Sequence, residues 1–139
     1  MFDVDDPRIE RTMQSIIQRL SVPTPCGGIA RYEGDTYQRA LDGDTDSIPG
    51  NPWFICTLWV AQYHIRKARS LEELEPAREI IDWVGEHALP SGVLAEQLDP
   101  HTGDPVGTSP LTWSHGTLVL TIKEYTERYL ELSGVQRPI

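Results

Sequence analysis

Hydrophobic residues recur at helical spacing in four segments of the chain, and polar, turn-forming residues separate these segments. The first segment follows Asp6 and Pro7, a capping residue and a proline suited to the first position of a helix. Pro23 and Pro25 interrupt the pattern, so we expect a first helix that begins at Pro7 and ends before Pro23. Its apolar positions are Ile9, Met13, Ile16, Ile17 and Leu20.

A second start signal, Asn51 followed by Pro52, precedes the sequence WFICTLWVAQYHIRKA. This segment is apolar on nearly every side until its basic end, a pattern that is typical of a helix buried between neighbours. Lys67 and Arg69 near its C-terminus suit the dipole of a helix that ends there. We therefore expect a central, buried second helix.

Two further helices are predicted in the second half of the chain. Ser70 and Glu73 have the spacing of a capping box at the start of a third helix, which ends before Pro90. Its apolar face consists of Leu74, Ala77, Ile80, Ile81 and Val84. A fourth helix over about residues 111–132 is expected to turn one apolar face inward. The residues of that face are Leu118, Val119, Ile122, Tyr125 and Tyr129.

The connections between these helices alternate in length. Residues 22–52 contain nine of the 22 glycines and prolines, with room for one or two short strands, and residues 90–110 form a second long loop. A compact domain seldom contains loops this long unless they are functional or disordered. The predicted fold class is therefore all-α, with about four helices and long functional loops in one layered domain that spans residues 1–139.

Charge and composition narrow the function classes. The 21 acidic and 12 basic residues give a net charge of −9, which disfavours nucleic acid or an anionic membrane as a partner. The first residues lack the pattern of a signal peptide, and the apolar run over residues 53–65 is too short for a membrane span. Cys26, Cys56 and the four histidines lack metal-ligand spacing. We expect reduced thiols, no metal, no cofactor and a cytoplasmic protein.

Glu96 is the first candidate for chemistry. It lies in the stretch VLAEQLDPHTGD, within a loop that is shaped by prolines and glycines. A carboxylate held in such a loop can act as a general base if a partner acid lies across a cleft. The alternative is that Glu96 is a solvated surface charge.

A second group of candidates lies in the stretch IARYEGDTY. The arginine offers a planar set of donors for hydroxyl groups, and the tyrosine rings can stack on sugars. A solvated turn is the alternative interpretation of these residues. Trp113 could likewise be a platform for a sugar or part of the core. The cleft-type residues of the stretch are Arg31, Tyr32, Glu33, Asp35 and Tyr37.

Two blocks of sequence together resemble glycoside hydrolase family 15, the group of glucoamylases, glucodextranases and family-15 trehalases. GIARYEGDTY, followed by GNPWFICTLWVAQY, is similar to a family segment in which an Arg-Tyr loop precedes a helix start. SGVLAEQLDPHTGDPVGTSPLTWSH is similar to the segment that carries the catalytic base. The resemblance covers most of residues 25–131 and implies that the chain is the last third of an (α/α)6 barrel.

The resemblance also implies roles for individual residues. Glu96 would be the general base that activates water in an inverting hydrolysis of α-glucans or oligosaccharides. Arg31 would donate hydrogen bonds to sugar hydroxyls. The other pocket residues would shape the site, bind the glucose or support the base loop, which is the loop of residues 90–110 that carries Glu96. These are Tyr32, Asp35, Tyr37, Gln97 and Trp113.

One part of the family's active site has no match here. The general acid belongs to an upstream segment of the family, and Glu33 does not fit its motif. The resemblance thus implies a C-terminal fragment of a glucoamylase-like exo-α-glucosidase. Its partner would be a separate chain with the upstream helices, or a second copy. A non-catalytic carbohydrate-binding or regulatory module of the same fold is the alternative, and the sequence leaves the linkage preference open.

Overall fold

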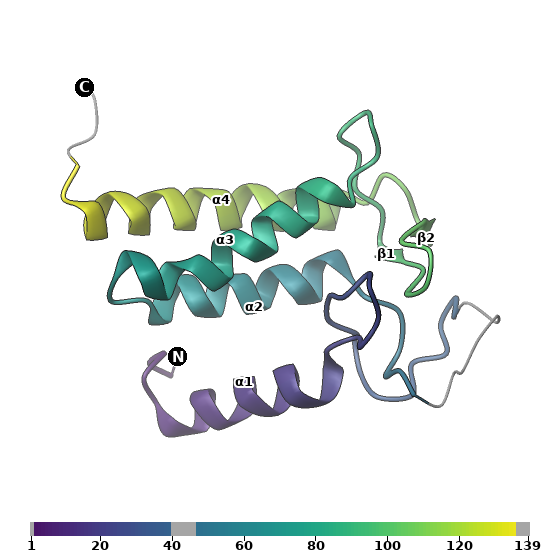
Figure 1. Ribbon diagram of the computed structural model, residues 1–139, viewed down its shortest axis with the longest axis horizontal. Helices are drawn as coiled ribbons and strands as arrows, with labels where there is room; N and C mark the ends of the chain where they lie inside the picture. The colour runs from purple at the N-terminus through teal and green to yellow at the C-terminus, as the bar shows by residue number, and fades with distance from the viewer. Residues whose placement is uncertain (1, 40–46, 136–139) are drawn as a thin grey trace.

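A computed structural model describes residues 2–39 and 47–135 of the chain (Figure 1). Over these residues the helices are α1 (Pro7–Leu20), α2 (Phe54–Lys67), α3 (Leu71–Glu86) and α4 (Thr112–Ser133). Two short antiparallel strands, β1 (Gln97–Leu98) and β2 (Pro105–Val106), form a hairpin between α3 and α4. The predicted all-α fold class is confirmed. None of the helices over the described residues is long and apolar enough to cross a membrane.

Short strands were expected in residues 22–52, and this expectation is wrong for the described part of that loop. It forms isolated bridges, Ser21 with Ile29 and Ala30 with Pro52. Residues 40–46 lie outside the described residues. The hairpin forms instead in the second loop, where the backbone of Trp53 at the start of α2 pairs with Gln97. This contact between the two loops could not be inferred from local propensity.

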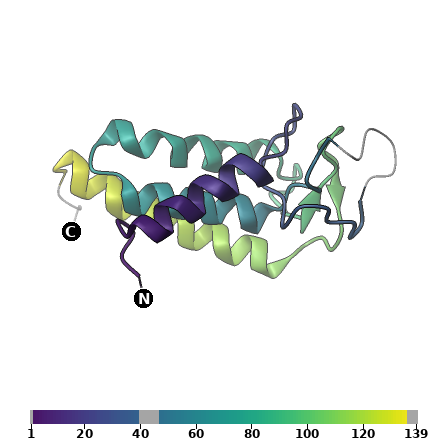
Figure 2. The same cartoon turned by 90° about the horizontal axis from the view of Figure 1, so that it is seen from below.

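Helix α2 is the centre of the molecule and contacts α1, α3 and α4 (Figures 1 and 2). Consecutive helices run antiparallel, so both long loops gather at the same end, beside the first turns of α2 and α4. The predicted burial of α2 is confirmed, because eight of its residues are buried. They are Phe54, Ile55, Cys56, Thr57, Leu58, Val60, Ala61 and Ile65.

The predicted caps of α1 and α3 are present. The Asp6 carboxylate accepts from the Arg8 N–H at 2.9 Å, and Ser70 Oγ accepts from the Glu73 N–H at 3.2 Å. The Glu73 carboxylate accepts from the Arg69 N–H at 2.6 Å, one residue before the N-cap, whereas the return bond of a capping box is made to the N-cap residue itself. Helix α2 differs, because it begins at Phe54 and has no side-chain cap. Its expected start residue, Asn51, is used elsewhere.

The inner face of α4 is not the one that hydrophobicity predicted. Val119, Ile122 and Tyr129 are exposed, whereas Leu118 and Tyr125 pack partly against the core. The fully inward positions are taken by small polar residues: Ser114, Thr117 and Thr121. The two threonine hydroxyls donate to the carbonyls one turn earlier at 2.8 Å, so they can be buried. Small side chains on this face allow α4 to lie close to α2.

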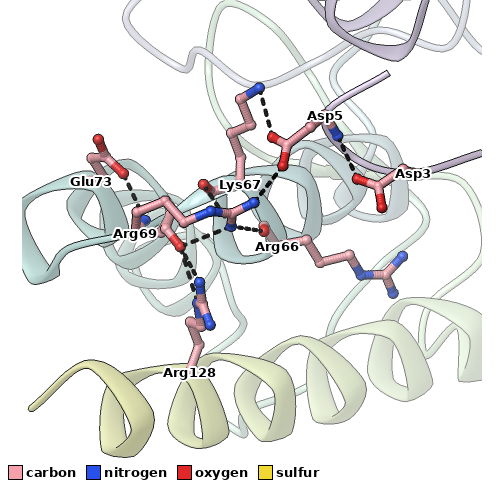
Figure 3. Close-up of polar contacts among 8 residues, drawn as sticks. Asp3, Asp5, Arg66, Lys67, Arg69, Glu73 and Arg128 are labelled. Atoms are coloured by element: carbon pink, nitrogen blue, oxygen red, sulfur yellow. Dashed lines mark hydrogen bonds and ion pairs between the residues drawn. The ribbon is translucent and has the colours of Figure 1, made fainter. Parts of the chain in front are cut away.

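The end of the bundle opposite the long loops is held by ion pairs (Figure 3). The Asp5 carboxylate bridges Lys67 at 3.0 Å and Arg69 at 2.6 Å, which ties the start of α1 to the α2–α3 turn. Arg128 Nε donates to the Ala68 carbonyl at 3.0 Å, which ties α4 to the same turn. These contacts close one end of the bundle, and the loops at the other end are left to form a site.

Candidate active site

The two long loops meet at the N-terminal ends of α2 and α4. The Leu98 N–H donates to the Pro52 carbonyl at 3.0 Å, which joins the hairpin to the segment before α2. Ser114 Oγ donates to the Ala95 carbonyl at 2.8 Å, which joins the same loop to α4. The structure therefore places the two predicted groups of site residues on one connected framework.

Glu96 projects from a rigid part of this framework. Its neighbours Ala95 and Gln97 are 2% and 0% exposed, whereas Glu96 itself is only partly buried. Its N–H donates to the Thr108 carbonyl at 2.9 Å, so the backbone is held from both sides. A partly exposed glutamate between two buried neighbours is better placed to act on a ligand than a fully solvated surface charge.

The surroundings of the Glu96 carboxylate are shaped by two residues. Gln97 Nε2 lies 3.4 Å from Glu96 Oε2 and donates a long hydrogen bond to it. Gly107, with φ of 80°, lies so close that a Cβ atom there would be 2.5 Å from the same oxygen. A side chain at position 107 would thus push the carboxylate away from its present position.

The Asp99 carboxylate, close to Glu96 in sequence, serves the hairpin turn. It accepts from the backbone N–H groups of His101 at 2.8 Å and Thr102 at 3.0 Å. Its own N–H donates to the Asp104 carbonyl at 2.8 Å. These bonds build a local turn of the type that aspartate favours. Asp99 therefore supports the base loop.

Arg31 is held in a fixed orientation by Asp35. Its Nε and Nη2 atoms donate to the two carboxylate oxygens, each at 2.9 Å. Asp35 is 2% exposed and also accepts from the Tyr37 N–H at 3.0 Å. Burial raises the pKa of the Asp35 carboxyl, but the hydrogen bonds from Arg31 and Tyr37 outweigh it, so this pKa lies below its usual value. Asp35 thus orients Arg31 and does not face an open site.

Aromatic rings surround the guanidinium group. Arg31 Cζ lies 4.6 Å from the ring centre of Trp53, 4.9 Å from that of Tyr32 and 5.3 Å from that of Tyr37. Tyr32 and Tyr37 are about half exposed, whereas Trp53 is buried below them. Trp53 was not predicted as a site residue from the sequence. Its position at the start of a buried helix, just after the Arg-Tyr loop, was the available signal.

Trp113 lies at the start of α4 and is 57% exposed, so it is not part of the core of the described residues. Its ring packs edge to face on Trp59 of α2, with ring centres 5.9 Å apart. Trp59 is also exposed, but unlike Trp113 it was not predicted as a site residue. The pair links the exposed faces of α2 and α4 next to the base loop.

Other parts of the described residues offer less chemistry. The Glu33 carboxylate is paired with Arg19 at the end of α1. A groove of about 400 Å³ between α1, α2 and α3 is mainly apolar, and its one histidine, His64, has a pKa lowered by burial. No group of three or more potential metal ligands is found among the described residues.

Comparison with protein families matches residues 1–123 to the model described as glycosyl hydrolases family 15. An uncharacterised glycosyl hydrolase of Methanocaldococcus jannaschii is 29% identical over 133 residues, which is 89% of this chain and 20% of that protein. Trehalase 1 of Sulfolobus acidocaldarius is 30% identical over 125 residues, 88% of this chain and 19% of that protein. The chain thus spans about one fifth of these relatives.

Solved structures show the same relationship. A bacterial glucoamylase in complex with acarbose matches with a TM-score of 0.74 and 25% identity, over 91% of this chain and 18% of that one. The glucoamylase of Saccharomycopsis fibuligera matches in fold with a TM-score of 0.63 and 24% identity, over 92% of this chain and 37% of that one. The four helices therefore form part of an (α/α)6 barrel, as the sequence predicted.

Proposed function

Because this chain belongs to glycosyl hydrolases family 15, we propose that it provides the general base, Glu96, of an inverting exo-α-glucosidase. The observation that carries the proposal is the setting of Glu96, a partly exposed carboxylate between two buried residues and beside a glycine that leaves it room. In this role the carboxylate takes a proton from water as the water attacks the anomeric carbon.

The second group of residues supports binding of a sugar. Arg31 is held by Asp35 through Nε and Nη2, and Nη2 also donates to the Tyr32 hydroxyl at 3.4 Å. Its Nη1 group would donate to hydroxyl oxygens of a ligand. The exposed rings of Tyr32 and Tyr37 flank it, and they offer apolar faces for a pyranose ring. Trp113, at the opening of α4, would contribute a third exposed ring, and Gln97 would hold the base.

An inverting site also needs a general acid, about 6.5–9.5 Å from the base. Two carboxylates of the loop that carries Arg31, Glu33 and Asp35, are both paired with arginines. We propose that the acid comes from family residues outside these 139. Without it the reaction would lose on the order of a hundred- to ten-thousand-fold in rate, so this chain alone should show little activity.

The exposed apolar side chains of α2 and α4 support such a completed site. Trp59 and Trp113 are about half exposed, as are Leu120 and Ile122, and Val119 is more exposed still. Apolar surface of this kind usually marks a contact with another part of a protein. We propose that upstream helices of the family barrel cover it, whether on the same polypeptide, on a separate chain or through a second copy.

The test is release of glucose from maltose, isomaltose and trehalose, because the relatives include trehalases and glucoamylases. The protein is assayed alone and together with the upstream barrel helices, as wild type and as Glu96→Gln. The matched control is Glu33→Gln, which alters a carboxylate of the Arg-Tyr loop. We expect turnover only in the completed protein, its loss in Glu96→Gln with sugar binding nearly unchanged, and its retention in Glu33→Gln.

Two other results would change the conclusion. Undiminished turnover in Glu96→Gln would remove the base assignment. The second result is sugar binding, measured by calorimetry, without turnover in either this chain alone or the completed protein. It would favour a non-catalytic carbohydrate-binding or regulatory module. That second candidate is favoured only by the pairing of the other nearby carboxylates with arginines.

A further inference from the structure

Asn51 lies directly behind the base loop, although the sequence suggested only a helix start. Its side chain is buried, with 2% of the residue exposed. Its Nδ2 donates to Gln97 Oε1 at 3.0 Å, across 46 positions of sequence, and to the Gln38 carbonyl at 2.9 Å. Both hydrogens of this amide are therefore used, and one of them reaches the residue next to Glu96.

These bonds determine which way each amide group faces. The Gln38 carbonyl can only accept, so Asn51 must turn its NH2 group toward it. The same NH2 group then requires an acceptor from Gln97, which leaves the Gln97 NH2 group directed at Glu96 Oε2. A carboxylate accepts from such a donor. Each hydrogen bond that links Gln38, Asn51, Gln97 and Glu96 therefore pairs a donor with an acceptor.

Asn51 contributes to this arrangement through the N–H groups of its side chain and not through its oxygen. Among the described residues no group donates to its Oδ1, which is buried. Burying an unpaired acceptor is unfavourable, whereas the two bonds that Asn51 donates are favourable. Gln38, whose carbonyl anchors the series, has a φ of 51°, which is uncommon outside glycine. The anchor is thus held in an unfavourable backbone conformation.

We propose that Asn51 is a positioning residue for Glu96 and acts through Gln97. The inference rests on the proposed function of Glu96 as the base. With Gln97 fully buried and its amide orientation set by Asn51, the carboxylate keeps a donor on Oε2, and Oε1 would be the oxygen that takes the proton from water. If the Asn51 donor that faces Gln97 were replaced by an acceptor, the Gln97 amide would rotate. Its carbonyl oxygen would then face the Glu96 carboxylate.

The test is the variant Asn51→Asp in the completed protein, that is, this chain together with the upstream barrel helices. The substitution keeps the shape of the side chain but replaces its donor by an acceptor. We expect kcat to fall on the order of ten- to a hundred-fold, because a small displacement of a reacting group has effects of this size. KM should change by no more than about two-fold, since substrate contacts are untouched. Glu96→Gln is measured beside it.

The control for a merely structural role is Thr57→Val. Thr57 is buried in the same region, donates to the Trp53 carbonyl at 2.8 Å and accepts from the Ile29 N–H at 3.0 Å. Its loss should lower the melting temperature and leave kcat nearly unchanged. If Asn51→Asp and Thr57→Val reduce kcat equally, Asn51 is structural and the proposal is wrong. If Glu96→Gln keeps full turnover, the proposed base fails instead.

A second measurement does not depend on the folding of Asn51→Asp. In the active enzyme labelled with ¹⁵N-glutamine, the Gln97 side-chain NH2 resonance should move when Glu96 is replaced by glutamine. A Gln97 resonance that stays unchanged in Glu96→Gln would show that its NH2 group does not face Glu96, which would overturn the proposal.

Discussion

Replacing Asp35 by asparagine should destabilise the loop that carries Arg31. The carboxylate accepts three hydrogen bonds, two from Arg31 and one from the Tyr37 N–H. Asparagine keeps one oxygen and places an NH2 group where the other oxygen was. That NH2 group then faces a guanidinium N–H, so two donors meet and Arg31 loses its charge partner.

The magnitude follows from the burial of the two partners. A hydrogen bond to a charged group contributes about 1.5–3 kcal/mol, and Asp35 is 2% exposed. The Arg31 side chain is 36% exposed, so water can take over part of the lost contact and reduce the cost. We expect a loss of about 2 kcal/mol in the free energy of unfolding at neutral pH. This corresponds to a melting temperature lower by about 7 °C.

The effect should depend on pH in a definite direction. The pKa of Asp35 is lowered in the folded protein, so its ionised form stabilises the fold above the unfolded-state pKa of about 3.9. This contribution is lost as the pH falls through the lower folded-state pKa. The difference between wild type and Asp35→Asn should therefore be largest at neutral pH and shrink below about pH 4.

The assay is thermal unfolding by circular dichroism at several pH values. The matched control is Asp82→Asn, because Asp82 pairs with Arg78 at the same i,i+4 spacing but on the exposed surface of α3. We expect no measurable change in that variant. The reasoning would be refuted if both variants were equally stable, or if the deficit of Asp35→Asn persisted unchanged in acid.

Two further predictions use pairs of variants in the same way. Gly107→Ala should lower kcat of the completed enzyme by at least about ten-fold. The new Cβ atom would lie 2.5 Å from Glu96 Oε2, so the carboxylate has to move away. Gly92 has a similar positive φ, but a Cβ atom there would meet no atom within 4 Å beyond its chain neighbours, so Gly92→Ala should leave kcat unchanged. Equal rates in the two variants would contradict the prediction. Thr121→Val should cost about 1–2 kcal/mol in urea unfolding, because it removes a buried acceptor for an amide of α2. Thr126→Val, an exposed hydroxyl with the same bond to its own helix, should cost much less, and an equal loss would show that burial is not the cause.

The helices could be predicted because their signals are local. The proline after Asp6 and the N-cap Ser70 act within one turn of the helix they start. The apolar spacing of α3 is likewise a property of one segment. The inner face of α4 could not be predicted in this way, since apolar residues lie on several sides of this helix. Packing against α2 selected Thr117 and Thr121, whose small side chains allow close approach.

The site was predicted in part. Glu96, Gln97 and Arg31 followed from the resemblance of two sequence blocks, and the structure places these blocks on one framework. Their catalytic and binding roles stay predictions. The position of Asp35 beneath Arg31, the ring of Trp53 below it and the contact of Asn51 with Gln97 were not predicted. Each of them depends on atoms that meet only after the loops have folded against each other.

The amino-acid sequence by itself determined where the helices form, which of them is buried and which family the chain resembles, because these are recorded in spacing and residue type. The tertiary structure decided which way the carboxylates and amides face. Asp35 is a partner of Arg31 and Glu33 a partner of Arg19, whereas Glu96 alone of these three reaches out beside a glycine. The physical reason is that the role of a charged group depends on what surrounds it, and the surroundings of Glu96 come from segments far apart in the chain.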